Sequence, residues 1–310
     1  MKIVFNALRS GCGLNGGTRT ILKSAESLCK IGHEVKIASI VDNFTWFDHE
    51  PTINYLPNNF DTIINVAAVD YEVTRKSNIP IKVAFWRAHE VWSNTESHLR
   101  YCYSDTKVKN IVNSIGLQQL LSTYGADSKV VYQGMDLDDW KYVGGRSYDK
   151  IRIGCLYQKK PTKRWKDFVK LSEILGHEDY EYVGFGDTMR EDSFLNKFIC
   201  LPTHDELVDL YSSCDIWMCP TVLEGLHNIG LEAALCGCLI VCSDAPMNGM
   251  IYDYANEETA MIYEDGDIEG AAKLIRNADF SLVPKMQYYI KTNIGTREDN
   301  MKKMIDYLRS

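Results

Sequence analysis

The stretch TVLEGLHNIGLEAALCGCLIVCS, residues 221–243, predicts a turn, a helix and a strand in immediate succession. Glu224 stands before the expected helix and Glu232 stands in one of its early turns, with an Asn-containing turn between them. The run LIVCS (239–243) is short, apolar and strand-sized. A buried strand that follows a helix so closely is typical of a parallel sheet covered on both faces.

The same alternation of short apolar strands and helices runs through the first half of the chain. A helix is predicted from about Thr18 to Ile31. The expected strands are 2–7, 33–40, 61–67, 81–86, 108–114 and 128–133. We therefore predict an N-terminal Rossmann-like domain over 1–145, which ends in the polar, glycine-containing linker 141–150.

The alternation restarts after this linker. Strands are expected at 151–157, 181–186, 197–202, 215–220 and 239–243. Helices are expected at about 164–175, after the capping-box sequence THDE (203–206) and after Glu224. These elements form a second Rossmann-like domain over 146–290, and 291–310 holds a C-terminal helix that we expect to pack back toward the N-terminal domain. The predicted fold class is α/β, with two facing Rossmann-like domains and a ligand cleft between them.

Composition sets the broad class of the protein. The chain has 310 residues, of which 45% are hydrophobic and 25% charged, so it is long enough for two folded domains. Its longest apolar runs are strand-sized and its start has no signal-peptide pattern, so we expect a cytoplasmic protein without a transmembrane segment. Ten cysteines are present without a recurring metal-type spacing. Reduced buried thiols are therefore favoured over a zinc site or a disulfide framework.

Charge is distributed unevenly along the chain. The net charge is −8, yet residues 1–145 hold 15 Lys or Arg against 15 Asp or Glu, and the remainder holds 19 against 27. This balance gives no global attraction for nucleic acid or anionic membrane, and leaves only a local basic cleft as a means of binding them.

The stretch GCGLNGGTRT (11–20) contains the spacing GxGxxG at Gly11, Gly13 and Gly16, between a strand and a helix. The spacing suggests dinucleotide binding. That fingerprint, however, needs its first glycine directly after the strand, and three residues intervene here. Gly16 and Gly17 still allow backbone N–H groups at the helix start to approach a ligand closely. We favour a phosphate- or substrate-facing loop over a merely flexible one.

The stretch FWRAHEVW (85–92) follows an expected strand. Arg87 and His89 are therefore predicted at the carboxyl end of that strand, facing the cleft. A histidine there is able to donate to or orient a sugar or a phosphate. It is equally suited to a hydrogen bond with a loop carbonyl.

The stretch LYQKKPTKRWKDF (156–168) joins an expected strand to a helix. Its cations are Lys159, Lys160, Lys163, Arg164 and Lys166. Cations at such a junction suit a diphosphate, because they neutralise charge where helix N-termini already favour anions. The alternative is a solvated basic turn. We favour the diphosphate site because the cations stand in an otherwise acidic domain.

The two acids of the opening stretch suit the two sugars of a nucleotide sugar. The backbone N–H groups of 225–229 are expected to be partly free at the helix start, where a phosphate can bind. Glu224 and Glu232 would then accept hydroxyls on either side of that phosphate, one from each sugar. The alternative is a helix-start acid favoured by the macrodipole together with an ordinary surface glutamate.

The block EGLHNIGLEAALCGCLIVCSDAP (224–246) resembles the E-x7-E block of the family 4 retaining glycosyltransferases, which have the GT-B fold. Other blocks of that family follow in order along the chain. Their sequences here are NGGTRTILKSAESLCKIGHEV (15–35), NSIGLQQLLSTYG (113–125), VVYQGMDLDDW (130–140) and LVDLYSSCDIWMCPTVLEG (207–225). Because several ordered blocks agree, the resemblance covers most of the chain.

The resemblance implies roles for residues of the second domain. Glu224 would contact hydroxyls of the donor sugar, and Glu232 would contact the ribose. Lys163 would hold the diphosphate, assisted by backbone groups near Asn228 and Ile229. Enzymes of this family usually need no metal ion and no cofactor beyond the nucleoside diphosphate sugar that they use as donor.

The resemblance also implies roles in the first domain, which would bind the acceptor. Gly16 and Gly17 would approach the donor phosphates, and His89 would lie near the transferred sugar. The family usually has Gly-Arg-Leu and then Lys-Gly after the first strand of its second domain, whereas this chain has Gly-Cys-Leu and then Lys-Arg. Lys159 is therefore the best substitute for the second phosphate cation, and Arg164 is the next.

We predict a retaining, metal-independent glycosyltransferase that moves a hexosyl or pentosyl group from a nucleoside diphosphate sugar to an acceptor hydroxyl. The catalytic set comprises Glu224, His89 and Lys163. A polysaccharide, a lipid, a protein or hydroxymethylated nucleic acid would each serve as acceptor.

Three alternatives remain at this point. The first is another enzyme of the GT-B fold, such as a nucleotide-sugar epimerase. The second is a dinucleotide-dependent oxidoreductase that uses Gly11, Gly13 and Gly16, with Asp42 as the acid for the ribose. The third is a catalytically silent nucleotide-sugar-binding protein, which the presence of both motif acids and the basic stretch makes less favoured.

Overall fold

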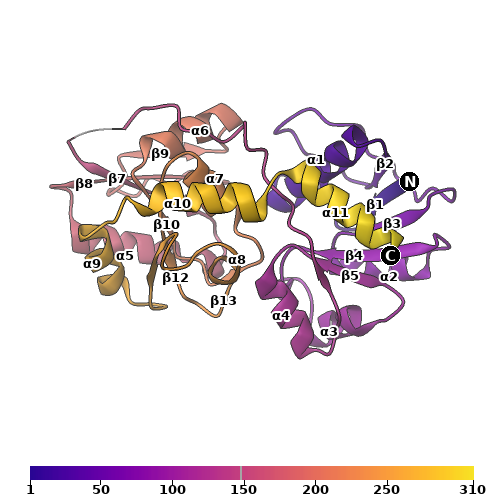
Figure 1. The fold of residues 1–310 in the computed structure, drawn as a ribbon. Helices are drawn as coiled ribbons and strands as arrows, with labels where there is room; N and C mark the ends of the chain where they lie inside the picture. Colours follow the sequence, from indigo (N-terminus) through magenta and orange to yellow (C-terminus); the bar gives the residue numbers. More distant parts are fainter. Residues whose placement is uncertain (147–148) are drawn as a thin grey trace. The chain divides into compact units, whose positions relative to one another are not determined.

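The computed structural model describes residues 1–146 and 149–310. The chain divides into two compact units (Figure 1): Met1–Met135 with Gly295–Ser310, and Asp136–Ile294. The changes of unit therefore fall at 135/136 and 294/295, not at the expected 145/146 and 290/291. The expected linker 141–150, apart from residues 147–148, which lie outside the described residues, belongs to the second unit. There the Val143 N–H donates to Ser212 Oγ over 3.1 Å.

The first unit is built on a parallel sheet. Its strands are β1 (Lys2–Asn6), β2 (Glu34–Ala38), β3 (Thr62–Asn65), β4 (Ile81–Trp86), β5 (Lys109–Val112) and β6 (Lys129–Val130). They are arranged in the order β2-β1-β3-β4-β5-β6. The helices are α1 (Gly16–Lys30), α2 (Tyr71–Lys76), α3 (Glu96–Ser104), α4 (Ile115–Thr123) and α11 (Arg297–Arg309), with a 3₁₀ turn at Ala68–Asp70.

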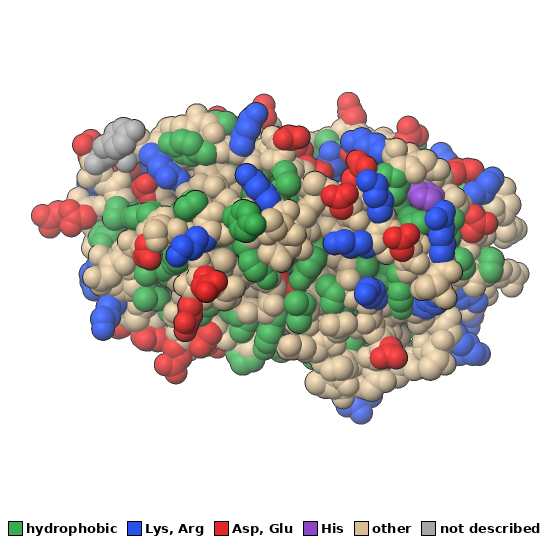
Figure 2. Space-filling model, in the orientation of Figure 1, with side chains coloured by type: hydrophobic (Ala, Val, Ile, Leu, Met, Phe, Trp, Pro, Cys, Tyr) green, Lys and Arg blue, Asp and Glu red, His purple; other side chains and the backbone are tan. Residues whose placement is uncertain are grey.

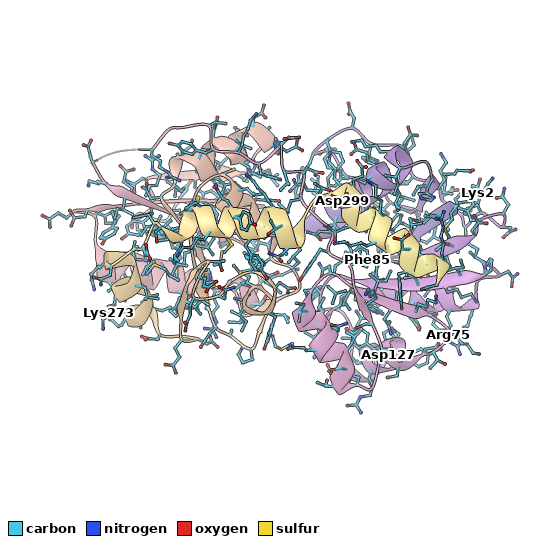
Figure 3. All side chains as sticks on the ribbon, in the orientation of Figure 1. Lys2, Arg75, Phe85, Asp127, Lys273 and Asp299 are labelled. Atoms are coloured by element: carbon cyan, nitrogen blue, oxygen red, sulfur yellow. The ribbon has the colours of Figure 1, made fainter. Side chains whose placement is uncertain are left out.

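The strands of this sheet are buried on both faces, as their continuous apolar sequences predict. In β4, Val83 and Phe85 pack into the core that includes Ile21 of α1 and Met304 of α11. The alternate residue Trp86 packs into a second core that includes Leu99 of α3. Figure 3 shows Phe85 inside this unit, while the charged side chains of Lys2, Arg75 and Asp127 lie on its outside. The period of two along each strand therefore supplies both cores.

The C-terminal helix α11 completes the first unit. Gly134 has φ +70°, and a Cβ there would overlap the backbone of Arg297. The Met135 N–H donates to the Gly295 carbonyl over 3.0 Å, and the Arg297 N–H donates to the Met135 carbonyl over 3.3 Å. The two segments that leave this unit are thus joined to each other, and only glycine fits where they meet.

The second unit holds another parallel sheet. Its strands are β7 (Ile151–Tyr157), β8 (Tyr180–Gly186), β9 (Lys197–Cys200), β10 (Ile216–Cys219), β12 (Leu239–Ser243) and β14 (Met261–Tyr263), in the order β14-β12-β10-β7-β8-β9. A separate parallel pair consists of β11 (Leu223–Glu224) and β13 (Met247–Asn248). The helices are α5 (Trp165–Leu175), α6 (His204–Ser213), α7 (Asn228–Leu235), α8 (Met250–Asp253), α9 (Ile268–Arg276) and α10 (Leu282–Tyr289), with a 3₁₀ turn at Pro161–Lys163 and a π-helix at Ile290–Ile294.

Local sequence signals explain where these helices begin. The predicted capping box of α6 is present: the Glu206 N–H donates to Thr203 Oγ1 over 3.3 Å, and Glu206 Oε2 accepts the Thr203 N–H over 2.8 Å. Helices α5 and α9 cover one face of the sheet, where Phe168 and Ile275 share one core. Gly154 of β7 lies on Trp217 of β10 so closely that a Cβ would overlap the indole ring.

In the view of Figure 2, Lys and Arg side chains are interspersed with Asp and Glu side chains over the surface of both units. Over the first unit, this mixing agrees with the even charge balance of residues 1–145. Among the described residues, no helix is both long enough and apolar enough to cross a membrane.

Candidate functional site

The second sheet has its topological switch point between β7 and β10. From β7 the chain continues through β8 to β9 on one side, and then returns to β10 and β12 on the other. Ligands of open α/β sheets bind at the carboxyl ends of strands at such a point, because the connections on the two sides diverge there. The carboxyl ends of β7 and β10 are therefore the expected place for a site.

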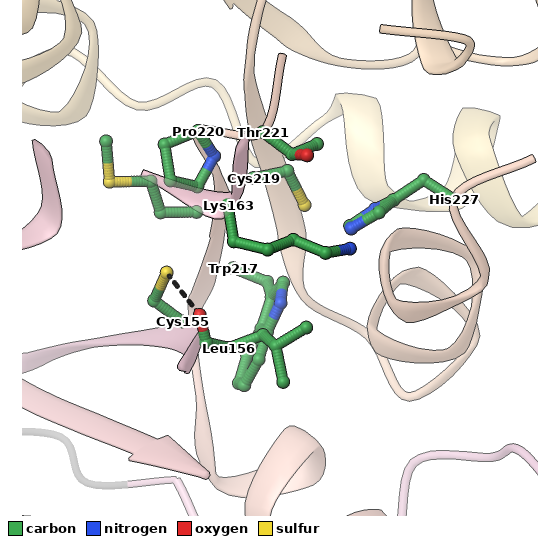
Figure 4. A pocket seen from close by; sticks show the side chains of 9 residues that line it. Cys155, Leu156, Lys163, Trp217, Cys219, Pro220, Thr221 and His227 are labelled. Atoms are coloured by element: carbon green, nitrogen blue, oxygen red, sulfur yellow. Dashed lines mark hydrogen bonds between the residues drawn. The ribbon is translucent and has the colours of Figure 1, made fainter. Parts of the chain in front are cut away.

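A narrow pocket lies at this edge (Figure 4). It is lined by Cys155, Leu156, Lys163, Trp217, Met218, Cys219, Pro220, Thr221 and His227. Its volume is about 10 Å³, the room of roughly one water molecule. The lining joins the apolar ends of two strands to three polar side chains, from Lys163, Thr221 and His227. These polar groups give the pocket its chemistry.

Lys163 and Glu224 form an ion pair beside this pocket. Their side chains are 14% and 15% exposed, so the pair is largely shielded from water. Thr221 Oγ1 lies 2.8 Å from Glu224 Oε1 and donates to it. Burial raises the pKa of Glu224, but Lys163, His227 and Thr221 outweigh burial and hold the pKa of this carboxyl below its ordinary value. Glu224 is therefore ionised at neutral pH.

Backbone contacts fix the position of Lys163. It closes the 3₁₀ turn Pro161–Lys163, which follows β7. The Val222 N–H donates to the Thr162 carbonyl over 3.0 Å, and Thr221 Oγ1 lies 3.1 Å from the same carbonyl oxygen. The loop after β7 and the loop after β10 are thus tied together one residue before Lys163.

The segment around Glu224 is held by a close approach of two backbones. Glu224 pairs with Asn248 in the parallel β11–β13 ladder. A Cβ on Gly249 would overlap the Gly225 carbonyl oxygen, so glycine is required at 249 although its φ is ordinary. The Asn248 side chain donates to the Ser243 carbonyl over 2.8 Å. These contacts fix the backbone from which the Glu224 carboxylate reaches Lys163.

His227 is the N-cap residue of α7. Its Nδ1 accepts the Gly230 N–H over 3.3 Å, and the Tyr254 hydroxyl donates to the His227 carbonyl over 2.7 Å. Burial lowers the pKa of His227 to about 4, with Lys163 adding to the effect and Glu224 opposing it. The imidazole is therefore neutral at neutral pH. Because the helix begins at Asn228, the free N–H groups of its first turn start later than the predicted 225–229.

Glu232 lies deeper than predicted. It is 2% exposed on α7 and does not line the pocket of Figure 4. The Tyr211 hydroxyl donates to Glu232 Oε2 over 3.4 Å. The alternative of an ordinary surface glutamate is therefore wrong, and the role of Glu232 at a ribose stays a prediction.

The other predicted donor-binding residues of this unit do not line the pocket. Asn228 and Ile229 are half-buried at the start of α7, and Lys159 is exposed. Arg164 has φ +49° and its Nη1 lies 2.7 Å from Asp265 Oδ1 and 3.5 Å from Asp167 Oδ2. In this structure the Arg164 guanidinium is thus directed to carboxylates, which leaves Lys159 as the exposed cation of the two candidates.

His89 of the first unit is buried and bonded at both ring nitrogens. It is 3% exposed, with Nδ1 3.0 Å from the Tyr103 hydroxyl and Nε2 3.3 Å from Glu96 Oε2. Burial lowers the pKa of His89, against the opposing effect of Glu96. The alternative of a loop carbonyl partner is not observed, because two side chains hold the ring. The role of His89 near a transferred sugar stays a prediction.

Gly16 and Gly17 form the start of α1, whose N-cap Asn15 accepts the Thr18 N–H over 2.9 Å. A Cβ on Gly16 would meet nothing within 4 Å, whereas one on Gly17 would lie 3.1 Å from Arg87 Nη1. The Arg87 guanidinium donates to the carbonyls of Gly17 and Val66. Arg87 therefore connects the glycine turn to the end of β3, and the space at Gly16 is open to a ligand.

The spacing Gly11, Gly13 and Gly16 does not form a dinucleotide loop here. Cys12 bridges Asp42 in a parallel pairing, and its N–H donates to the Val41 carbonyl over 2.8 Å. The segment that would have to curve around a pyrophosphate is thus bonded to the chain after β2. Helix α1 begins only at Gly16.

Comparisons with known proteins agree with this geometry. Residues 156–278 match the family model described as Glycosyl transferases group 1. The matched region covers less than half of the 310 residues and shows what this part of the chain is similar to. It contains Lys163, Glu224 and Glu232 as well as the pocket-lining His227. The match confirms the resemblance that the sequence blocks indicated, and supports the predicted glycosyltransferase activity over the alternatives.

Solved structures show that the fold extends beyond this domain to the whole chain. The sucrose-phosphate synthase of Thermosynechococcus elongatus superposes with a TM-score of 0.81 at 14% identity, over 100% of this chain and 98% of its own. HepE of Anabaena, solved with UDP and glucose, superposes with a TM-score of 0.74 at 14% identity, over 100% of this chain and 99% of its own. An alpha-glucosyltransferase solved with UDP-glucose and DNA containing an abasic site superposes with a TM-score of 0.68 at 13% identity, over 100% of this chain and 99% of its own. The predicted α/β GT-B fold is confirmed. Among curated proteins, no sequence matches this chain significantly.

Two polar residues of the matched region, residues 156–278, were not singled out by the sequence prediction. Thr221 follows β10 and Pro220, and His227 stands three residues before Gly230, where an N-cap residue is expected. The available signal for His227 was its position just before the predicted helix, which is the N-cap position. Histidine is not among the preferred N-cap residues, so the signal was weak.

Proposed function

We propose that the protein is a retaining, metal-independent glycosyltransferase that moves a sugar from a nucleoside diphosphate sugar to an acceptor hydroxyl. The observation that carries the proposal is the Lys163–Glu224 pair, which lies at the switch point of the second sheet within the matched region. A cation and a carboxylate at that edge suit the two polar parts of such a donor, its diphosphate and its sugar hydroxyls.

The donor separates the two members of this pair. The Lys163 ammonium moves to the diphosphate, and the Glu224 carboxylate accepts sugar hydroxyls. Thr221, which donates to Glu224 over 2.8 Å, keeps the carboxylate oriented after the Lys163 ammonium has moved to the diphosphate. The pocket must widen in this step, since its volume is about 10 Å³.

The chemical step depends mainly on stabilising the negative charge that develops on the diphosphate. The bond between the anomeric carbon and the phosphate oxygen breaks, and the electron pair stays on the departing diphosphate. Lys163 and the N-terminus of α7 stabilise that charge, which removes the need for a metal ion. The leaving phosphate oxygen takes the proton of the acceptor hydroxyl on the same face, where the new carbon–oxygen bond forms with retention.

The donor and acceptor classes rest on the named neighbours and on the charge distribution. HepE is solved with UDP and glucose, and the alpha-glucosyltransferase with UDP-glucose. We therefore propose a uridine diphosphate sugar as donor. The even charge of residues 1–145 favours a neutral acceptor such as a saccharide over DNA.

The decisive experiment offers metal-free protein a panel of nucleotide sugars and acceptors. A thermal shift with UDP-sugars, GDP-mannose and ADP-glucose selects the donor. The selected donor is then mixed with saccharide, lipid, protein and hydroxymethylated DNA acceptors, and release of nucleoside diphosphate is measured. We expect release only with an acceptor, unchanged by EDTA, and a product whose anomeric NMR signal keeps the donor configuration. Conversion of the donor without acceptor would instead establish an epimerase.

A further inference from the structure

His227 has one ring nitrogen committed to the fold and one directed elsewhere. Its Nδ1 accepts the Gly230 N–H over 3.3 Å. A neutral imidazole that accepts at Nδ1 carries its proton on Nε2. Because burial holds the pKa of His227 at about 4, the ring is neutral near physiological pH. The Nε2–H group is therefore a fixed, uncharged donor.

The Nε2–H group of His227 points into the pocket at the carboxyl ends of β7 and β10. Figure 4 shows the His227 ring and the Lys163 ammonium directed toward one another across that pocket. Glu224 Oε1 lies 3.9 Å from Nε2, which is too far for a hydrogen bond. Within the part of the chain that the structure describes, Nε2 makes no hydrogen bond, although the side chain is only 5% exposed. The Nε2 atom is not itself fully enclosed, so a ligand in the pocket is able to reach it.

The ring cannot easily turn away from the pocket. The Tyr254 hydroxyl donates to the His227 carbonyl over 2.7 Å and fixes the backbone. Gly230 packs closely against the same group of residues: a Cβ there would lie 2.5 Å from the Tyr254 hydroxyl and 3.2 Å from His227 Nδ1. Rotating the imidazole would also break the N-cap of α7. The direction of Nε2–H is thus set by the fold before any ligand arrives.

We propose that His227 is a donor-binding residue whose Nε2–H donates a hydrogen bond to a phosphate oxygen of the nucleoside diphosphate. This inference rests on the proposed function. A phosphate oxygen is the appropriate acceptor because Lys163 and the first turn of α7 already favour an anion at this point. The neutral ring adds a directional donor that selects the position of that oxygen, while Lys163 supplies the charge.

The test separates this role from helix capping. In His227→Asn, the amide oxygen of asparagine still caps Gly230, since asparagine is a preferred N-cap residue, but the Nε2–H donor is lost. In His227→Ala both are lost. His177→Asn is the matched control, because His177 lies exposed in the loop before β8, at the opposite edge of the sheet. Calorimetric affinities for UDP, UDP-glucose and uridine are compared at one salt concentration, together with the midpoint of thermal unfolding.

We expect His227→Asn to keep the unfolding midpoint near that of the wild type. The affinities for UDP and for UDP-glucose should both decrease by the same factor, roughly 3- to 10-fold. Uridine affinity and the His177→Asn variant should not change. Unchanged UDP affinity in His227→Asn, or a loss confined to UDP-glucose, would overturn the phosphate contact and leave the proposed function intact. Failure of the wild type to bind UDP, GDP or ADP at all would instead reject the proposed function itself, and with it this inference.

Discussion

The Lys163 ammonium and the Glu224 carboxylate neutralise each other at the carboxyl edge of the second sheet. The two residues are 61 positions apart in sequence and meet because the loops after β7 and β10 are hydrogen-bonded together. Each is also the residue best suited to one end of a nucleotide sugar. Under the proposed function, the pair is the resting state of the site, in which each charge occupies the place that a ligand group would take.

Removal of Lys163 should affect turnover more than folding. Lys163→Ala deletes the cation that we propose to meet charge on the departing diphosphate, and the loss of one such group typically costs about 10²- to 10³-fold in rate. We expect a decrease of that order in kcat, measured as release of nucleoside diphosphate with the best donor and acceptor. Lys166→Ala, which removes an exposed cation from the same stretch, is the control. Equal rates for the two variants would exclude Lys163 from the reaction.

Glu224 makes stability depend on pH in the acid range. Its pKa in the folded protein lies below the ordinary 4.5, so the pair stabilises the fold above about pH 4.5 and loses that effect as pH falls through the folded pKa. Glu224→Gln should lower the free energy of unfolding by on the order of 1–3 kcal/mol near neutral pH.

The difference between wild type and Glu224→Gln should shrink as the pH falls below about 4.5, because the protonated carboxyl then resembles the amide. Chemical unfolding at several pH values measures this convergence. Glu257→Gln, at an exposed position, should show no such trend. A difference that stayed constant with pH would mean that Glu224 is not stabilised by the pair.

His227 gives a second pH effect with a different window. Its pKa is near 6.5 when unfolded and about 4 when folded, so the unfolded chain binds more protons between these values. Stability should therefore fall as the pH is lowered from about 6.5 to 4, and should not change further through this group below that range. His227→Asn should flatten the slope of unfolding free energy against pH in this window. Parallel slopes in the two proteins would contradict a buried neutral imidazole.

The fold was largely predictable because most strands are short apolar runs that stand out in the local sequence, although β11, β13 and β14 were not predicted. The apolar runs at 151–157 and 239–243 became β7 and β12 with little or no shift, and the sequence THDE opened α6 as a capping box. The domain boundary was less predictable. The polar stretch 141–150 looks like a linker, yet its described residues bond to other parts of the second unit through contacts such as that of Val143 with Ser212. Composition does not reveal such long-range partners.

The position of Lys163 and Glu224 near the strand ends was predictable from residue type and strand order, and their roles toward a ligand stay predictions. The site was not predictable where a distant partner decides exposure. His89 follows a strand as expected, but Tyr103 and Glu96 of α3 enclose its ring. Arg164 meets Asp265, a partner 101 residues away. The role of His227 as both cap and pocket residue appears only when Gly230 and Lys163 are seen together.

Gly249 should be essential for the position of Glu224. A methyl group at 249 would overlap the Gly225 carbonyl oxygen, and both partners are backbone, so neither can move without displacing the β11–β13 pair. Gly249→Ala should therefore lower the free energy of unfolding by about 1–3 kcal/mol, in the range of overpacked cores, and reduce donor affinity as well. Gly16→Ala serves as the control for stability, because a Cβ there meets nothing within 4 Å and alanine favours a helix. Thermal unfolding and calorimetric titration of the selected donor measure the two effects. A Gly249→Ala protein as stable as Gly16→Ala would show that the loop at 225 relaxes freely, and that the backbone contact does not position the Glu224 carboxylate.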